Sequence, residues 1–230
     1  MDYGNEHDRG RRILSKMTIL YIIGAGGFGF EAALICDAML ASKSAPFNSY
    51  AFLDDDPEYL NKRGQQQLFA GKLNSHEVDP SALYICAIGD PNSRKSSVRT
   101  LQAKHAQFTN IIHPTAIVAD SAQIGEGVII CAFAFISTFT KIGNHVHVNV
   151  SSSVGHDSVL SDFCSLSSHV DITGNVSVEE RVFFGTGAAV LPGFKIAADC
   201  RIGANVHVMR NLKPESIMYN EPAKFLNKKS

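Results

Sequence analysis

The sequence has little that would tie it to a metal, a membrane or a nucleic acid. Its five cysteines are odd in number and include no CxxC pair, which favours reduced, buried thiols over a disulfide framework and argues against structural zinc. No apolar run approaches the roughly 20 residues that cross a bilayer. Basic and acidic residues nearly balance, 21 against 22, so bulk charge indicates no nucleic-acid or membrane surface. We expect a cytoplasmic protein without metal, nucleic-acid or membrane partners.

The first part of the chain alternates strand and helix patterns after a charged start. Residues 1–16 are polar and have no period, so we expect a flexible extension there. Short apolar runs of buried-strand type, with helical spacing between them, follow at 19–23, 50–53 and 82–88. Such runs predict a parallel sheet with helical crossovers. Residues 17–108 are therefore predicted to form a small α/β, Rossmann-like domain.

The second part repeats every six residues. Seventeen consecutive positions at this spacing are large and apolar: Ile112, Val118, Ile124, Ile130, Ile136, Ile142, Val148, Val154, Leu160, Leu166, Ile172, Val178, Phe184, Val190, Ile196, Ile202 and Val208. This period fits neither a helix nor a simple strand alternation, but it is typical of a hexapeptide-repeat parallel β-helix. Three short strands make one coil of 18 residues, and coils stack at about 4.8 Å. We predict a β-helix over 109–212 and a C-terminal cap over 213–230.

Glycines recur directly after the inward aliphatic residue of the repeat. Gly155 and four similar glycines stand where the chain bends, and we expect each bend to need a small or conformationally free residue.

A glycine-rich turn, Gly24-Ala25-Gly26-Gly27-Phe28-Gly29, lies between a predicted strand and a predicted helix. Backbone N–H groups and the positive end of a helix at such a turn favour a diphosphate. The motif does not select NAD, because the acidic residues Asp54 and Asp55 follow about thirty residues later instead of about twenty. At a strand end, these carboxylates are placed to accept hydrogen bonds from a base or a sugar. A turn needed only for packing remains the alternative.

A second candidate site is His156-Asp157, at the bend after Val154. A histidine beside a carboxylate can act as a general base, because the carboxylate favours the imidazolium that forms. Gly174 is 18 residues later, one coil above, so its N–H could face a developing oxyanion near this base. The alternative for His156 alone is a plain surface histidine. We predict no metal site, because His145 and His147 alternate on one strand without an evident third ligand.

Several motifs of the chain resemble one family. They are the GAGGFG turn, FLDDD, AIGDPNSR, IHPTA, the hexapeptide array and the near-terminal EPAK. Over Met17 to about Leu226 the chain is similar to nucleotide-sugar acetyltransferases that join a small Rossmann-like domain to a left-handed β-helix, such as the bacillosamine-pathway N-acetyltransferases and relatives that O-acetylate sialic acids. The resemblance implies a homotrimer, with acetyl-CoA between adjacent β-helices and the nucleotide sugar toward the Rossmann-like domain.

The resemblance also implies roles for individual residues. His156 would deprotonate the sugar amine, Asp157 would orient it, and Asn149 would belong to the active-site wall. The positions that match the cofactor site are Gly174, Ser165, Thr186 and Ala204. The positions that match the nucleotide-sugar site, besides Asn149, are Gly24, Gly26, Gly27, Asp54 and Asp55. Two departures concern the sugar: Phe28 and Ser165 stand where close relatives carry histidines.

We therefore expect transfer of an acetyl group from acetyl-CoA to the amino group of a nucleotide-linked amino sugar, of the UDP-4-amino-4,6-dideoxy type. Two alternatives stay open at this point. One is O-acetylation of a sialic-acid-type sugar by the same residues. The other is a nonenzymatic β-solenoid that binds or assembles and only buries a core.

Overall fold

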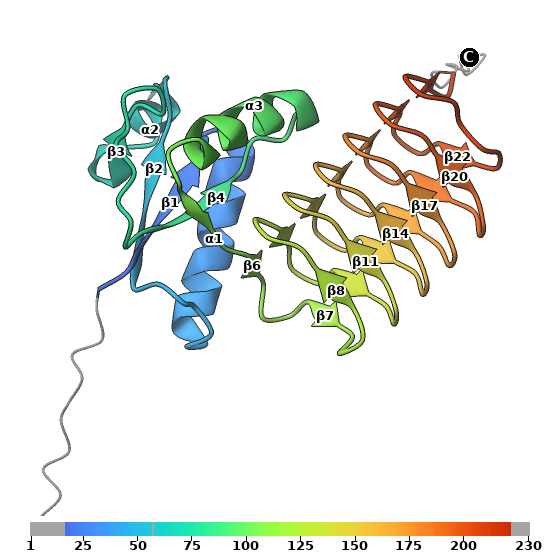
Figure 1. Ribbon diagram of the computed structural model, residues 1–230, viewed down its shortest axis with the longest axis horizontal. Coiled ribbons are helices and arrows are strands. Elements are labelled where there is room, and N and C mark those ends of the chain that lie inside the picture. Colours follow the sequence, from blue (N-terminus) through green and yellow to red (C-terminus); the bar gives the residue numbers. More distant parts are fainter. Residues whose placement is uncertain (1–16, 57, 222–230) are drawn as a thin grey trace, which may run out of the picture.

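The computed structural model describes residues 17–56 and 58–221, which form an α/β unit followed by a long β-helix (Figure 1). The extension expected over 1–16 and the final part of the expected cap lie outside the described residues. None of the helices in the described part of the chain is both long and apolar enough to cross a membrane.

The α/β unit is a five-stranded parallel sheet with helices between its strands. Its strands are β1 (Ile19–Ile23), β2 (Ser49–Leu53), β3 (Phe69–Gly71), β4 (Leu83–Cys86) and β5 (Gln107–Phe108), in the spatial order β3-β2-β1-β4-β5. Its helices are α1 (Gly27–Ala41), α2 (Glu58–Lys62), the 3₁₀ turn η1 (Gln66–Leu68) and α3 (Pro91–Gln102). Asp90 caps α3 by accepting the Ser93 N–H at 2.9 Å, and Pro91 occupies the first turn, where no N–H is needed. The parallel sheet predicted from the apolar runs is present.

The β-helix consists of two-residue strands, and in β6 to β22 the second residue is the inward apolar residue predicted by the six-residue period. These strands are β6 (Ile111–Ile112), β7 (Ile117–Val118), β8 (Gln123–Ile124), β9 (Ile129–Ile130), β10 (Phe135–Ile136), β11 (Lys141–Ile142), β12 (His147–Val148), β13 (Ser153–Val154), β14 (Val159–Leu160), β15 (Ser165–Leu166), β16 (Asp171–Ile172), β17 (Ser177–Val178), β18 (Phe183–Phe184), β19 (Ala189–Val190), β20 (Lys195–Ile196), β21 (Arg201–Ile202), β22 (His207–Val208) and β23 (Ile217–Met218). The inward residues form one continuous buried core.

The strands stack into three parallel sheets, which we call faces. The first face is β6-β9-β12-β15-β18-β21-β23, the second is β7-β10-β13-β16-β19-β22 and the third is β8-β11-β14-β17-β20. The first corner joins the first and second faces, the second corner joins the second and third, and the third corner returns to the first face. The first face lies toward α1 and the sheet, and its residues Ile111, Ile129 and Cys131 belong to the same buried cluster as α1 (Figure 1).

Directly after the inward residue, the bends use glycine for close approach. A Cβ at Gly155 would lie 2.5 Å from the Thr173 carbonyl carbon in the next coil, so the stacking of coils itself excludes a side chain. Positive φ values occur two residues later in the bend, at non-glycine residues such as Asp157 (58°) and also at Gly127, Gly187 and Gly193. The expectation of a small or conformationally free residue directly after the inward residue is therefore met by smallness.

The stack continues past the boundary expected at 212. β23 pairs in parallel with β21, and Leu212 forms a bridge to Ile196, so the segment expected to be a cap adds a further rung to the first face. The aliphatic period stops at Val208, but the backbone pairing does not. All five cysteines are buried and free, as predicted.

Candidate active site

The glycine turn borders a cavity of about 350 Å³ at the carboxyl ends of β1 and β4. The strand order reverses between these two strands, which is where open parallel sheets bind ligands. Helix α1 begins at this turn with Gly26 as its N-cap, no capping side chain and no acidic residue in its first turn. Gly24 has φ of 95°, which glycine adopts without strain. The turn thus presents backbone N–H groups and a positive helix end to the cavity.

Three of the predicted substrate glycines and both carboxylates line this cavity together: Gly24, Gly26, Gly27, Asp54 and Asp55. The carboxylates already carry hydrogen bonds within the chain. Asp54 accepts the Ala25 N–H at 2.6 Å, which ties β2 to the glycine turn. Asp55 accepts from the backbone N–H of Asn74 at 3.3 Å and from its side-chain amide at 2.9 Å.

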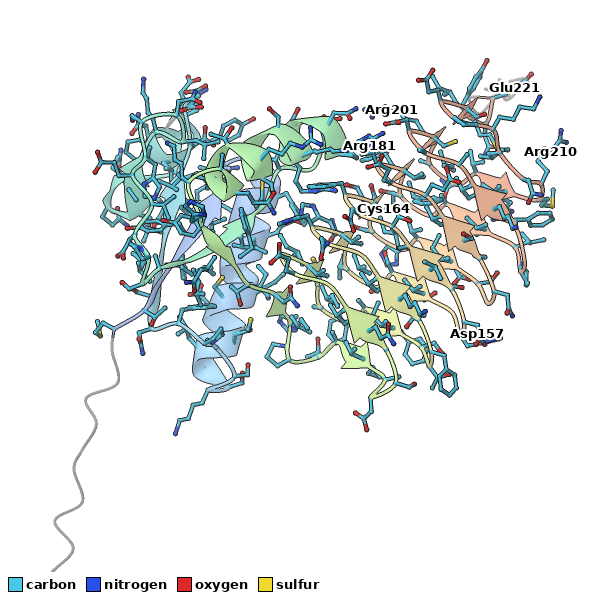
Figure 2. All side chains as sticks on the ribbon, viewed as in Figure 1. Asp157, Cys164, Arg181, Arg201, Arg210 and Glu221 are labelled. Atoms are coloured by element: carbon cyan, nitrogen blue, oxygen red, sulfur yellow. The ribbon has the colours of Figure 1, made fainter. Side chains whose placement is uncertain are left out.

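His156 and Asp157 form the second part of the site, on the second corner. The imidazole Nδ1 lies 2.8 Å from the Asp157 carboxylate, and both side chains are more than half exposed. Because a carboxylate only accepts hydrogen bonds, Nδ1 carries the proton and Nε2 keeps its lone pair. Figure 2 shows Asp157 on the outer edge of the β-helix, away from the α/β unit.

Gly174 lies directly above the imidazole. A Cβ at this position would be 2.6 Å from Nε2 of His156, so the ring fits only because residue 174 has no side chain. The Gly174 carbonyl accepts from the Gly193 N–H, whereas the Gly174 N–H meets no acceptor among the described residues. The predicted base and the predicted amide are thus brought to the same corner.

The other predicted residues lie elsewhere on the same chain. Asn149 lies on the first corner, just after β12, and Thr186 and Ala204 lie on the same corner in later coils. The Asn149 side-chain oxygen accepts the Val150 N–H at 2.6 Å, which leaves its amide N–H groups free to donate. The single chain therefore separates the base from Asn149 by the width of the second face.

Ser165 is buried against the α/β unit and not near His156. Its hydroxyl donates to the Gly89 carbonyl at 2.9 Å. With Gly89, Phe28 and Asn149 it lines a small cavity of about 60 Å³ that shares Phe28 and Gly89 with the cavity at the glycine turn. The expectation that Ser165 contributes to the cofactor site stays a prediction, and the structure places this residue beside the cavity at the glycine turn.

A larger groove of about 750 Å³ follows the third corner. Its charged residues are mainly the carboxylates Asp162, Glu179 and Glu180, with Lys141 opposite in sign. Carboxylates repel phosphates, so this groove is a poor site for either a nucleotide sugar or acetyl-CoA despite its size. Within 17–56 and 58–221, no cluster of three His, Cys, Asp or Glu side chains is arranged to hold a metal ion.

Known proteins resemble this chain in both units. Residues 19–101 match the family described as the PglD N-terminal domain. The GDP-perosamine N-acetyltransferase of Escherichia coli O157:H7 is 27% identical over 188 residues, which cover 77% of this chain and 80% of that protein. The UDP-N-acetylbacillosamine N-acetyltransferase of Bacillus subtilis (strain 168) is 31% identical over 120 residues, covering 50% of this chain and 52% of that protein.

A solved structure extends the likeness over nearly the full length. It is a histidine-to-asparagine mutant of perosamine N-acetyltransferase from Caulobacter crescentus in complex with CoA and GDP-perosamine. The match covers 91% of this chain and 97% of the chain in that structure, with 30% sequence identity and a TM-score of 0.76. This chain belongs to the nucleotide-sugar N-acetyltransferases. The family resemblance drawn from the motifs is confirmed.

Sequence reasoning missed the wall that this N-acetyltransferase builds between its two units. Gly89 and His147 line the small cavity, and Phe28 packs its ring 4.9 Å from that of His147. A signal for Gly89 was present, because it ends the β4 run on the same sheet edge as the glycine turn. The contribution of His147 had no local signal, since its neighbours across the wall are more than fifty residues away in the chain.

Proposed function

We propose that this N-acetyltransferase transfers the acetyl group of acetyl-CoA to the 4-amino group of a UDP-linked 4-amino-4,6-dideoxy sugar, with His156 as the general base. In this proposal residues 17–108 are a Rossmann-like nucleotide-sugar domain and residues 109–212 a left-handed β-helix that carries the acyl-transfer site. The observation that carries the proposal is the His156–Asp157 pair beneath the free N–H of Gly174. Family membership supports the acetyl donor and the amino-sugar acceptor.

The proposed roles of His156, Asp157 and Gly174 follow from which of their groups donate and which accept hydrogen bonds. Asp157 holds the Nδ1–H of His156, so Nε2 can take a proton from the neutral sugar amine as its nitrogen attacks the thioester carbonyl. The Gly174 N–H can donate to the oxyanion that forms. The new C–N bond replaces the C–S bond, and the imidazolium returns the proton to the leaving thiolate. Holding amine and thioester together contributes roughly 7 kcal/mol or more, and the proton transfer typically ~10²- to 10⁴-fold.

The separation of the two corners supports a site shared between copies in a homotrimer. The nucleotide cavity, Phe28 and Asn149 lie toward the first corner, while His156 lies on the second. Between these corners the early coils expose an apolar surface, with Ile117 at 62% and Phe135 at 44% exposure in register on the second face. Exposed apolar surface of this kind favours association. A neighbouring copy that covers it would bring its His156 to the first corner of this one.

The engagement of both carboxylates supports uracil over guanine. Each oxygen of Asp54 and of Asp55 already accepts a hydrogen bond, which leaves one lone pair on each oxygen. Guanine offers an adjacent pair of N–H donors and would need the remaining lone pairs of both oxygens of one carboxylate. Uracil offers a single N–H, for which one remaining lone pair is sufficient.

The test is thiol release from acetyl-CoA with three acceptors: a UDP-linked 4-amino sugar, the GDP-linked analogue and free sialic acid. We expect release with the UDP-linked sugar and loss of kcat by ~10²- to 10⁴-fold in His156→Ala. His105→Asn is the matched control, because His105 is exposed, lines neither cavity and has a φ of 64°, which asparagine adopts readily. A His156→Ala protein with full kcat contradicts the base. Preference for sialic acid supports the O-acetyltransferase alternative, and absence of release with every acceptor supports the nonenzymatic solenoid.

A further inference from the structure

Arg94 of α3 is a fully buried arginine between the two units. Its side chain is 0% exposed and its guanidinium reaches the first face of the β-helix. It contacts six groups: the carbonyls of Ile88 (2.8 Å), Gly89 (3.2 Å), Phe163 (2.6 Å) and Cys164 (3.1 Å), the Ser165 hydroxyl (2.9 Å) and His147 Nδ1 (3.0 Å). Its Nε has no partner among the described residues. Figure 2 places Cys164 on the side of the β-helix that faces α3.

Within residues 17–56 and 58–221, no carboxylate forms a hydrogen bond with this buried charge. The nearby Asp90 bonds instead to Ser93 and to Arg201. Burial lowers the pKa of Arg94 to about 10, so the side chain is still a cation at neutral pH. An apolar side chain of similar volume would fill the same space without the cost of desolvating a charge. Packing alone therefore does not account for a guanidinium here.

The guanidinium determines which of the groups around it accept and which donate hydrogen bonds. Arginine only donates, so His147 accepts at Nδ1 and must donate its Nε2–H to the Cys86 carbonyl at 2.8 Å. Ser165 accepts from Arg94 and donates to the Gly89 carbonyl. The network is closed, and it joins the end of β4 to β12 and β15.

Three of the six partners are walls of the small cavity beside the glycine turn. Gly89, His147 and Ser165 line it with Phe28 and Asn149, and Gly89 and Phe28 also line the larger nucleotide cavity. Arg94 lies one layer behind these walls and belongs to neither lining. Its hydrogen bonds thus join it to walls of the small cavity in both units: Gly89 in the α/β unit, and His147 and Ser165 in the β-helix.

We propose that Arg94 is a positioning residue for the nucleotide sugar: it holds the Gly89–His147–Ser165 wall in place and provides a positive charge, unpaired by any carboxylate, behind the site of the diphosphate. The proposal rests on the proposed function of the cavities. The cation bonds to Ser165. By the family resemblance, this is a position where close relatives carry a histidine. The network has no hydrogen bond to His156, Asp157 or Gly174 on the second corner.

The test compares Arg94→Lys with wild type by steady-state kinetics and by calorimetric binding of UDP and GDP alone. Lysine keeps the charge but cannot span six acceptors, so we expect KM for the nucleotide sugar and the Kd for the nucleoside diphosphate to rise about tenfold. KM for acetyl-CoA should stay within about twofold, because Arg94 has no hydrogen bond to Gly174, Thr186 or Ala204, three of the positions that match the cofactor site. Arg94→Met, which removes the charge as well, should weaken nucleotide binding further.

Arg201→Ala is the matched control. Arg201 also joins the β-helix to the start of α3, through Asp90 at 2.8 Å, but at the surface, where it is half exposed. We expect unchanged constants for both substrates in this variant. Ser165→Ala removes one acceptor of Arg94 and should raise the nucleotide Kd by less than Arg94→Lys does.

Three results are decisive. A lowered melting temperature of Arg94→Lys with unchanged nucleotide Kd overturns the proposal and leaves only a structural role. Equal loss in both substrate KM values also overturns it. Wild-type protein that binds nucleoside diphosphate but transfers no acetyl group contradicts the proposed function, whereas a tenfold weaker diphosphate Kd in Arg94→Lys still supports the positioning role. If Arg94→Met does not fold, the comparison of Arg94→Lys with Arg201→Ala still decides.

Discussion

At the residue scale, Gly174 is required by space. The imidazole of His156 occupies the volume that a side chain at 174 would need, and Gly174 lacks a positive φ that would call for glycine on other grounds. The contact between His156 and Gly174 therefore has two effects. The glycine lets the ring lie against the backbone, and the ring then has an amide N–H beside its Nε2.

Gly174→Ala should displace the imidazole and impair catalysis more than folding. A methyl group 2.6 Å from Nε2 forces the exposed ring to rotate away from Asp157, so we expect kcat to fall about 10²-fold or more. The melting temperature should change little, because the ring can move into solvent. Pro192→Ala, one coil higher on the same corner, is the control. Normal kcat in Gly174→Ala would show that the ring position does not matter for the reaction.

At the element scale, the start of α1 is an open anion site. The helix has no acidic residue in its first turn and no capping side chain, and a Cβ at Gly27 meets nothing within 4 Å. A side chain therefore fits there without steric cost. This separates the electrostatic role of the turn from its packing role, which Gly29 fulfils by lying against the Gly24 carbonyl.

Gly27→Glu places a carboxylate at this helix end, where it should repel the diphosphate. We expect KM for the nucleotide sugar to rise about tenfold or more, with KM for acetyl-CoA and the melting temperature near wild type. Gly27→Ala tests size alone and should be close to wild type in all three. If Gly27→Glu binds the nucleotide sugar normally, the glycine turn serves packing only, the alternative that the sequence left open.

The rungs of the third corner contain a second element-scale feature, the stack of His145 on Phe163. The rings are 5.1 Å apart and nearly parallel, His145 is 1% exposed and neither ring nitrogen has a partner among the described residues. Burial, and to a lesser degree the nearby Arg94 charge, lowers the pKa of His145 from 6.5 to about 4, against the opposing effect of Asp162. The folded state thus excludes a proton that the unfolded chain takes up.

His145→Phe should make stability less sensitive to acid. Between about pH 6.5 and 4 the unfolded wild-type chain binds this proton and the folded chain does not, so the free energy of unfolding decreases as pH falls, by roughly 3 kcal/mol in total. Phenylalanine already occupies equivalent left-handed bends at Phe133, Phe139 and Phe163, so it suits the backbone. Denaturant unfolding at pH 7 and pH 4.5 checks this. An equally steep loss in the variant would assign the acid sensitivity to other groups.

At the scale of the whole molecule, the two halves of the proposed site belong to different corners of one chain. If each site is shared between copies, an inactive His156→Ala copy and an inactive Asn149→Ala copy have complementary defects. After denaturation and refolding together, some interfaces should pair the two intact halves. We expect activity in the mixture to exceed that of either variant alone, with a trimer mass by light scattering. Unrestored activity at an intact trimer mass would place the whole site within one chain.

Local pattern determined more of the fold than of the site. The spacing of Ile112 to Val208 was sufficient to identify the inward residue of each strand from β6 to β22, because the period alone sets the inward side chain of each short strand. His156 and Gly174 could be matched for the same reason, since 18 residues make one coil. The burial of Ser165 against the α/β unit could not be predicted, because the same arithmetic does not say which face the α/β unit covers.

The sequence by itself determined the coils, their register and the glycine turn, since these depend on residues within one coil or one βα turn. Only the tertiary structure decided that α3 inserts Arg94 into the first face, that Ser165 and His147 are buried there, and that the base lies on a different corner from Asn149. The reason is physical: the two units are joined by hydrogen bonds such as those of Arg94 and Ser165, between groups 53 to 76 residues apart, whose geometry no local periodicity encodes.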